Sequence, residues 1–155
     1  MYPRLFIAIA MTSLLLTAQQ DVPLRGPGQF SATAAGAVIG TLQGDASATR
    51  FSDGRREFYL LLNSDQMMRQ KLMLSVTIKL PVPGEKAIAP TSHEAMVQWE
   101  SLANHTRTSV PATASIEMKG KDLLTGKFTI KSRDASHPLT LTGQFENAPI
   151  IADVN

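Results

Sequence analysis

The chain contains no cysteine among its 155 residues, and this absence removes several kinds of site at once. Disulfides, thiolate metal ligands and cysteine nucleophiles all depend on the thiol group. A lipid attached to an N-terminal cysteine is excluded in the same way. We therefore expect a mature protein that is released and that buries one core without covalent cross-links.

A strong charge of either sign is also lacking. Lysines and arginines total 15 against 13 aspartates and glutamates, and the net charge is +2. Loss of Arg4 with a signal peptide would leave +1. Because phosphate contacts need a concentrated basic stripe, nucleic-acid binding is disfavoured. No long stretch has the period of an amphipathic helix, so β-structure is expected throughout.

The first residues have the three parts of a secretory signal peptide. Arg4 supplies a positive charge, residues 5–16 form a short apolar run, and Ala18 precedes the polar Gln19. The run is too short for a membrane anchor, because spanning a bilayer takes about 20 apolar residues. We predict cleavage after Ala18, a secreted or periplasmic location, and no membrane span in the mature protein.

The rest of the chain is expected to form one domain. Residues 19–28 contain two prolines and two glycines, which predicts an extended lead-in. Residues 29–148 carry the alternating patterns of strands, and residues 149–155 are expected to form a C-terminal tail. The predicted division is therefore a signal peptide at 1–18, a lead-in, a single domain and a tail.

Three segments give the clearest strand signals. Residues 72–80 place five apolar residues at strict period two, and the prolines that follow stop the strand. Residues 123–145 alternate on both sides of a polar connection, which predicts a hairpin with Lys127 and Lys131 on its outer face. Asp53-Gly54 lies between two further apolar segments and is a strong hairpin-turn signal.

About eight or nine short strands joined by turns predict a single all-β domain. We predict an antiparallel β-sandwich in preference to a closed barrel. The strands near residues 30–42 are rich in small side chains, and those in the middle of the chain are limited by prolines. Both features are typical of the edges of an open sheet.

Part of this pattern resembles a group of secreted bacterial β-sandwich proteins and lipoproteins of unknown function. The similarity lies in residues 72–84, Thr125-Gly-Lys-Phe128 and Leu141-Thr-Gly-Gln-Phe145, and it covers about half of the mature chain. The chain departs from many members because it has no lipid-bearing cysteine. The resemblance implies an envelope or secreted location and no assigned activity.

The last strands are also similar, more weakly, to those of the YceI-like periplasmic lipid-binding barrels. Thr125-Gly126, Thr129-Ile130 and Pro138-Leu-Thr-Leu141 match that family's pattern. The opening aspartate-histidine region of the family is missing here. This likeness would imply an apolar ligand held inside a barrel.

Side chains of the types that bind zinc are scattered along the chain, at His93, Glu94, Glu100, His105 and His137. Imidazole and carboxylate groups suit zinc, but the spacing matches no ligand pattern. Each histidine falls in a predicted turn or connection, where a solvated side chain is the usual case. We predict no metal site and no cofactor.

Asp134, Ser136 and His137 have the residue types of a hydrolase triad. A triad is defined by its geometry, and residues this close in one loop seldom reach that geometry. The sequence also has no Gly-x-Ser-x-Gly elbow. We predict a protein that is not an enzyme.

Five cationic side chains follow one another in the later part of the chain. They form a candidate face for a polyanion such as a surface glycan or lipid headgroups. The alternative is a solvated sheet face whose lysines discourage edge pairing. The residues are Lys119, Lys121, Lys127, Lys131 and Arg133.

Two functions fit these patterns. The first is an exported binding or interaction module whose partner is an unknown protein, glycan or apolar ligand. The second is a periplasmic or extracellular carrier that holds an apolar small ligand in an internal cavity. The lining of that cavity would be Phe58, Leu60, Leu74, Val76, Trp99 and Phe128.

Overall fold

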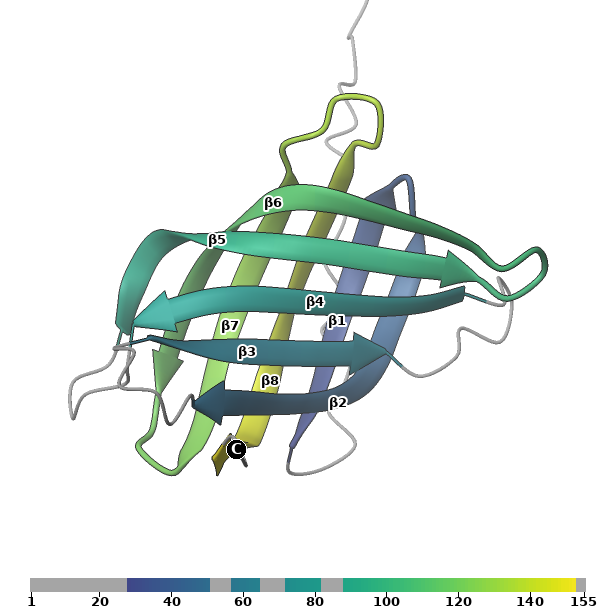
Figure 1. Cartoon of the computed structure of the whole chain (residues 1–155). Coiled ribbons are helices and arrows are strands. Elements are labelled where there is room, and N and C mark those ends of the chain that lie inside the picture. The colour runs from purple at the N-terminus through teal and green to yellow at the C-terminus, as the bar shows by residue number, and fades with distance from the viewer. Residues whose placement is uncertain (1–27, 51–56, 65–71, 82–87, 153–155) are drawn as a thin grey trace, which may run out of the picture.

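The computed structural model describes residues 28–50, 57–64, 72–81 and 88–152, and within these ranges it forms eight strands and no helix (Figure 1). The all-β prediction is confirmed. No helix among these residues is long and apolar enough to cross a bilayer. The strands are β1 (Gln29–Gly36), β2 (Gly40–Arg50), β3 (Glu57–Ser64), β4 (Leu72–Pro81), β5 (Ile88–Ser101), β6 (Thr106–Lys119), β7 (Leu123–Ser132) and β8 (Leu139–Ala152).

The sheet closes into a barrel. Each strand pairs antiparallel with the next along the chain, and β8 pairs with β1. The prediction of a β-sandwich is therefore wrong. The small-residue strand β1 is not an edge, because it lies between β2 and β8. Strand β4, which ends at Pro81, is not an edge strand either, because it lies between β3 and β5.

Closure is completed beyond the start of β1. The Gly28 amide donates to the Glu146 carbonyl at 2.7 Å, and the Gly28 carbonyl accepts from the Ala46 amide at 2.6 Å. Past this point β2 and β8 pair directly and in parallel, Ala48 to Arg50 against Ile150 to Ala152. Strand β8 thus continues into residues 149–152, which the sequence assigned to a tail.

Small residues let the strands of this seam approach one another. Gly143 of β8 lies opposite Ala32 of β1. A β-carbon at Gly143 would collide with the Ser31 carbonyl oxygen and would lie 2.7 Å from the Ala32 β-carbon. Ala32, one of the small residues that suggested an edge, therefore lies where the sheet closes.

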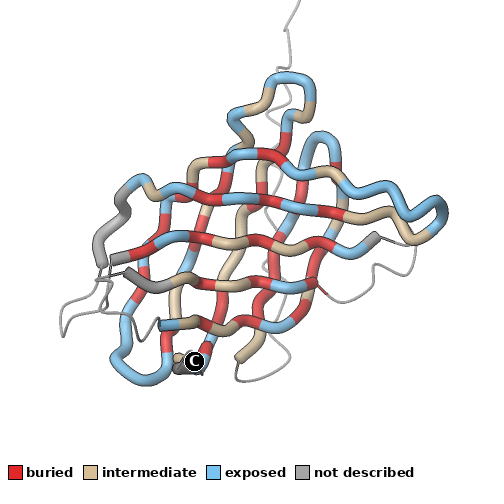
Figure 2. Tube along the Cα trace, viewed as in Figure 1, coloured by how far each residue is buried: buried red, intermediate tan, exposed pale blue. Residues whose placement is uncertain are grey.

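Alternate residues point into the barrel, and buried positions alternate with exposed ones along the strands (Figure 2). The interior of an eight-stranded barrel is either filled by side chains or wide enough to hold one small ligand. Among the described residues, nearly all of the inward-pointing hydrophobic side chains are less than 4% exposed. A cavity large enough for a ligand would leave its lining accessible, so the described side chains fill the interior.

Several local predictions are confirmed. The strand at residues 72–80 lies within β4, and the hairpin at residues 123–145 is formed by β7 and β8. Lys127 and Lys131 are exposed on its outer face, while Phe128 and Ile130 are buried. The Asp53-Gly54 turn, the signal peptide and most of the lead-in lie outside the described residues.

Candidate functional site

The interior residues expected to line a carrier's cavity are instead packed into the core. Leu60, Leu74, Val76 and Phe128 are at most 3% exposed, and Trp99 is 9% exposed. The side chain of Phe58 lies outside the described part of the chain. A binding site is therefore best sought on the outer surface.

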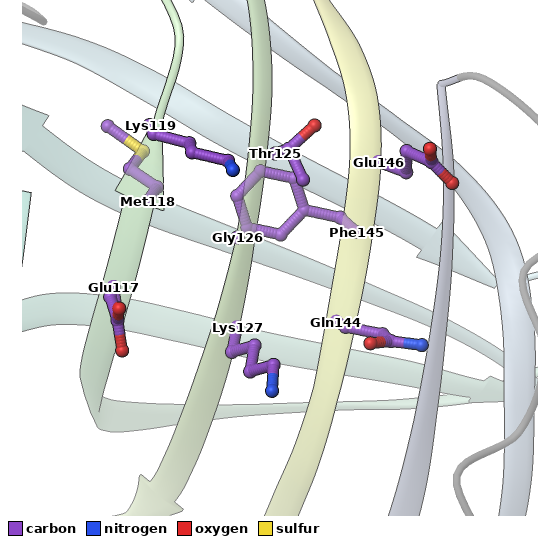
Figure 3. Close-up of a pocket in the computed structure, with 9 residues that line it drawn as sticks. All are labelled: Glu117, Met118, Lys119, Thr125, Gly126, Lys127, Gln144, Phe145 and Glu146. Atoms are coloured by element: carbon purple, nitrogen blue, oxygen red, sulfur yellow. The ribbon is translucent and has the colours of Figure 1, made fainter. Parts of the chain in front are cut away.

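The outer surface has a depression of about 540 Å³ over three adjacent strands, β6, β7 and β8 (Figure 3). We call it the β6–β8 depression. Figure 3 shows that polar side chains surround its centre, where Gly126 lies between Met118 and Phe145. Its lining consists of Glu117, Met118, Lys119, Thr125, Gly126, Lys127, Gln144, Phe145 and Glu146.

Cross-strand pairing places the polar groups of the depression. Glu117 of β6 lies opposite Lys127 of β7, and Lys127 lies opposite Gln144 of β8. Lys119 lies opposite Thr125 in the next outward row. Side chains in such pairs have β-carbons about 5 Å apart, close enough to contact one ligand together.

The floor of the depression is made by the residues between these two rows. Met118 and Phe145 point inward and are 3% and 1% exposed. Gly126 has no side chain, and a β-carbon there would lie 2.8 Å from the Met118 β-carbon and 2.9 Å from Cζ of Phe145. The barrel wall is thus only backbone at Gly126, with apolar groups directly beneath it.

A bulge shapes the wall beside Gly126. The register between β7 and β8 shifts between Leu124 and Gly126, and Asn147 has a left-handed φ of 47°. The Asn147 amide donates to the Thr125 hydroxyl at 3.0 Å, and that hydroxyl donates to Oδ1 of Asn147 at 3.5 Å. Because a bulge bends its strand and increases the local twist, it accounts for a concavity here.

The charges in the β6–β8 depression are mixed. Lys119 and Lys127 are matched by Glu117 and Glu146. A polyanion would meet two carboxylates on this surface, whereas a partner with both charges would find complementary groups. The depression therefore suits a partner segment of mixed charge better than a polyanion.

The five predicted basic residues do not form one cluster. Lys119 and Lys127 line the β6–β8 depression, while Lys121 is exposed in the β6–β7 turn. Lys131 is four residues beyond Lys127 on β7, roughly 13 Å along the strand. Arg133 lines a separate depression of about 290 Å³, together with Tyr59, Thr77, Lys79, Glu94, Ala95 and Met96.

The predicted zinc-binding residue types do not converge, and the described residues contain no group of three or more that could hold a metal ion. Glu100 meets His105 at 3.6 Å and Arg107 at 3.0 Å near the β5–β6 turn. The hydrogen bond from Arg107 lowers the pKa of Glu100. His93 is on β5, where burial lowers its pKa, and His137 lies in the β7–β8 loop.

Asp134 organises the β7–β8 loop. The Ser136 hydroxyl donates to Oδ1 of Asp134 at 2.6 Å, and Nδ1 of His137 lies 2.8 Å from Oδ2. These hydrogen bonds, with a further one from the Ser136 amide, lower the pKa of Asp134 to about 2. His137 also packs edge-on against Trp99, with ring centroids 6.1 Å apart.

This loop does not have the geometry of a catalytic triad. In a triad the serine hydroxyl donates to the histidine, which is held in turn by the aspartate. Here the Ser136 hydroxyl donates to Asp134 instead. The arrangement fixes the conformation of the loop and places His137 against Trp99.

Sequence reasoning found Lys119 and Lys127 but missed the rest of the β6–β8 depression. Alternation identifies Gln144 as an outward residue, yet it does not show which residues of β6 and β7 lie beside it. Alternation places Phe145 on the inner face, but the bulge at Asn147 breaks the pattern just beyond it, and Glu146 was missed. The available signal was Thr125 and Asn147, two polar residues able to bond to each other across the hairpin.

Comparison with protein-family models, with curated proteins and with solved structures finds no match to this chain.

Proposed function

We propose that this chain is an exported binding module that contacts its partner through the β6–β8 depression. The observation that carries the proposal is the packing of the interior, where nearly all inward-pointing hydrophobic side chains of the described residues are less than 4% exposed. Because the described residues leave no internal site, the ligand groups are sought on the outside. The β6–β8 depression supplies polar groups of both charges around a backbone-lined centre at Gly126.

The partner segment is a polypeptide that carries both acidic and basic side chains. Its carboxylates would pair with Lys119 and Lys127, and its cations would pair with Glu117 and Glu146. Gln144 adds a donor and an acceptor that suit a backbone amide. Charge pairs of this kind contribute most to specificity and to the rate of association.

An apolar-ligand carrier is the weaker alternative. It would need a cavity among residues such as Leu60, Val76 and Phe128, which are packed in the core. The ligand would have to displace these side chains on entry. No observation on the described residues favours that rearrangement.

Export is supported by the order of charged, apolar and small residues in the first 18 positions. The test is N-terminal sequencing of the protein recovered outside the cytoplasm of its native host. We expect the mature chain to begin at Gln19. Recovery of the whole chain from the cytoplasm alone would contradict export.

The binding surface is tested by photocrosslinking in the native host. A photoreactive benzoylphenylalanine replaces Ser115, which is exposed on β6 beside Glu117. The control carries the same group at Gln98, which is exposed on the outer face of β5. We expect a partner other than this chain to be crosslinked from position 115 and not from position 98.

The charge of the depression is then reversed in the crosslinking variant. Lys127→Glu is expected to abolish the crosslink from position 115, because it removes a cation from the centre of the surface. Equal crosslinking from positions 115 and 98, or a crosslink unaffected by K127E, would contradict the proposal.

A further inference from the structure

Strand β6 pairs with β5 over almost its whole length but with β7 over only its second half. Residues from Thr106 to Met118 pair with β5, whereas pairing with β7 begins at Ala112. The Arg133 amide donates to the Pro111 carbonyl at 2.8 Å. Pro111 has no N–H to return this bond, so the β6–β7 ladder ends there.

Backbone geometry identifies the groups that face away from β5 beyond Pro111. Successive residues of an antiparallel strand direct their N–H and C=O groups to opposite neighbours. Because the Pro111 carbonyl faces β7, the backbone groups of Ser109 and Arg107 face the same side. Those of Thr108 and Val110 face β5. Among the described residues, no strand continues the ladder beside Ser109 and Arg107.

This free edge is accessible. Arg107 and Ser109 are exposed, and Thr108 between them is half-buried. Figure 1 shows the β5–β6 hairpin extending sideways beyond the end of β7. A second strand could therefore approach without meeting the barrel wall.

We propose that a second copy of this chain pairs with this edge, antiparallel and about a two-fold axis at Thr108. Such an axis places Arg107 opposite Ser109 of the other copy, and Ser109 opposite its Arg107. The outward N–H and C=O groups of both residues then form two reciprocal pairs, which makes the edge complementary to itself.

The charges agree with this arrangement. No two like charges are directly opposite, because each Arg107 faces a serine. Arg107 is also matched within its own copy, since it donates to Glu100 at 3.0 Å. The contact is short, so the dimer is weak and depends on protein concentration. This interface is separate from the β6–β8 depression and does not rest on the proposed binding function.

The test compares Ser109→Pro with Ser109→Ala in the mature chain. Proline removes the outward N–H and leaves the β5–β6 bonds of Thr108 and Val110 in place, whereas alanine keeps that N–H. Sedimentation from micromolar to millimolar concentration should show a monomer–dimer equilibrium for the unaltered chain and for S109A. The dissociation constant should rise about tenfold or more in S109P.

Amide hydrogen exchange supplies the second measurement. The amides of Arg107 and Ser109 should become protected as the concentration rises, while those of Thr108 and Val110 are protected at every concentration. Protection of the Thr108 and Val110 amides in S109P shows that the β5–β6 hairpin is folded in this variant. A monomer at all concentrations, equal dimerisation of S109P and S109A, or a dimer that leaves Arg107 and Ser109 unprotected would overturn the proposal.

Discussion

Two regions of the barrel wall differ in the inward side chains that their strands carry. The seam of β8, β1 and β2 mixes small residues, among them Ala32, Ala48 and Gly143, with large ones such as Phe30 and Phe145. The described inward side chains of β3 and β4, neighbouring strands at the front of the barrel (Figure 1), are almost all leucine, valine and isoleucine. At the seam, Gly143 and Ala32 lie where two strands approach closely. The difference shows that small residues can mark the closure of a sheet as well as its edge.

The largest loss of stability is expected when a large inward side chain of β3 or β4 is truncated. Leu62 is fully buried, so Leu62→Ala removes apolar contacts and leaves a cavity. We expect the free energy of unfolding to fall by about 3 kcal/mol. Urea denaturation measures the change, with Leu61→Ala on the outer face of the same strand as control. A loss below about 1 kcal/mol would show that the interior is loosely packed at this point.

A larger side chain at the seam of β8, β1 and β2 should cause the next largest loss of stability. In Gly143→Ala the added methyl group collides with the Ser31 carbonyl oxygen and crowds Ala32. The expected cost is about 2 kcal/mol, because overpacking forces the backbone to shift. Thr142→Ala, which alters an outward side chain beside it, is the matched control for the denaturation measurement. Equal stability of G143A and T142A would mean that close approach at the seam is unimportant.

Lowering the pH should loosen the β7–β8 loop before it destabilises the strands of the barrel. The folded-state pKa of Asp134, about 2, is below its ordinary value of 3.8. Its carboxylate therefore stabilises the folded chain above the ordinary pKa, and this contribution is lost as the pH falls towards 2. Trp99, the single tryptophan, reports the change because His137 packs against it.

The measurement is tryptophan fluorescence between pH 5 and pH 2. The unaltered chain should show a transition below the ordinary aspartate range, and Asp134→Asn should lack it because its amide does not titrate. An identical transition in both proteins would assign the change to another group.

The smallest effect on stability is expected on the outer face. Lys127 is exposed, so Lys127→Glu should change the free energy of unfolding by no more than about 0.5 kcal/mol. The same substitution is expected to abolish the crosslink. Thermal unfolding of the purified variant checks the first part. A large loss of stability would mean that Lys127 serves the fold and would remove it as a binding residue.

Individual strands and the β7–β8 hairpin were predictable from the sequence, whereas closure of the sheet into a barrel was not. Alternation identified the strand at residues 72–80 and the hairpin of β7 and β8, because burial of one face imposes a period of two. The pairing of β8 with β1 joins residues more than a hundred positions apart. Alternation carries no information about such a contact, and small residues such as Gly143 fit both an edge and a tight seam.

The candidate site was predictable only in part for the same reason. Lys119 and Lys127 were identified by type and by their outward positions. The positions of Glu117 and Glu146 beside these lysines depend on the register of three strands and on the bulge at Asn147. Two of the five predicted basic residues therefore lie on a surface of mixed charge.

The central claim is that the interior formed by the described residues is filled and that the partner binds outside. The most direct test is the Tm of the mature chain, from Gln19 to Asn155, with and without a saturating long-chain fatty acid. A native-state ligand at a hundred times its dissociation constant adds about 2.7 kcal/mol, which corresponds to a rise of roughly 8 °C for a chain of this size. We predict an unchanged Tm. A rise of that size would contradict the filled interior and would make the chain a carrier.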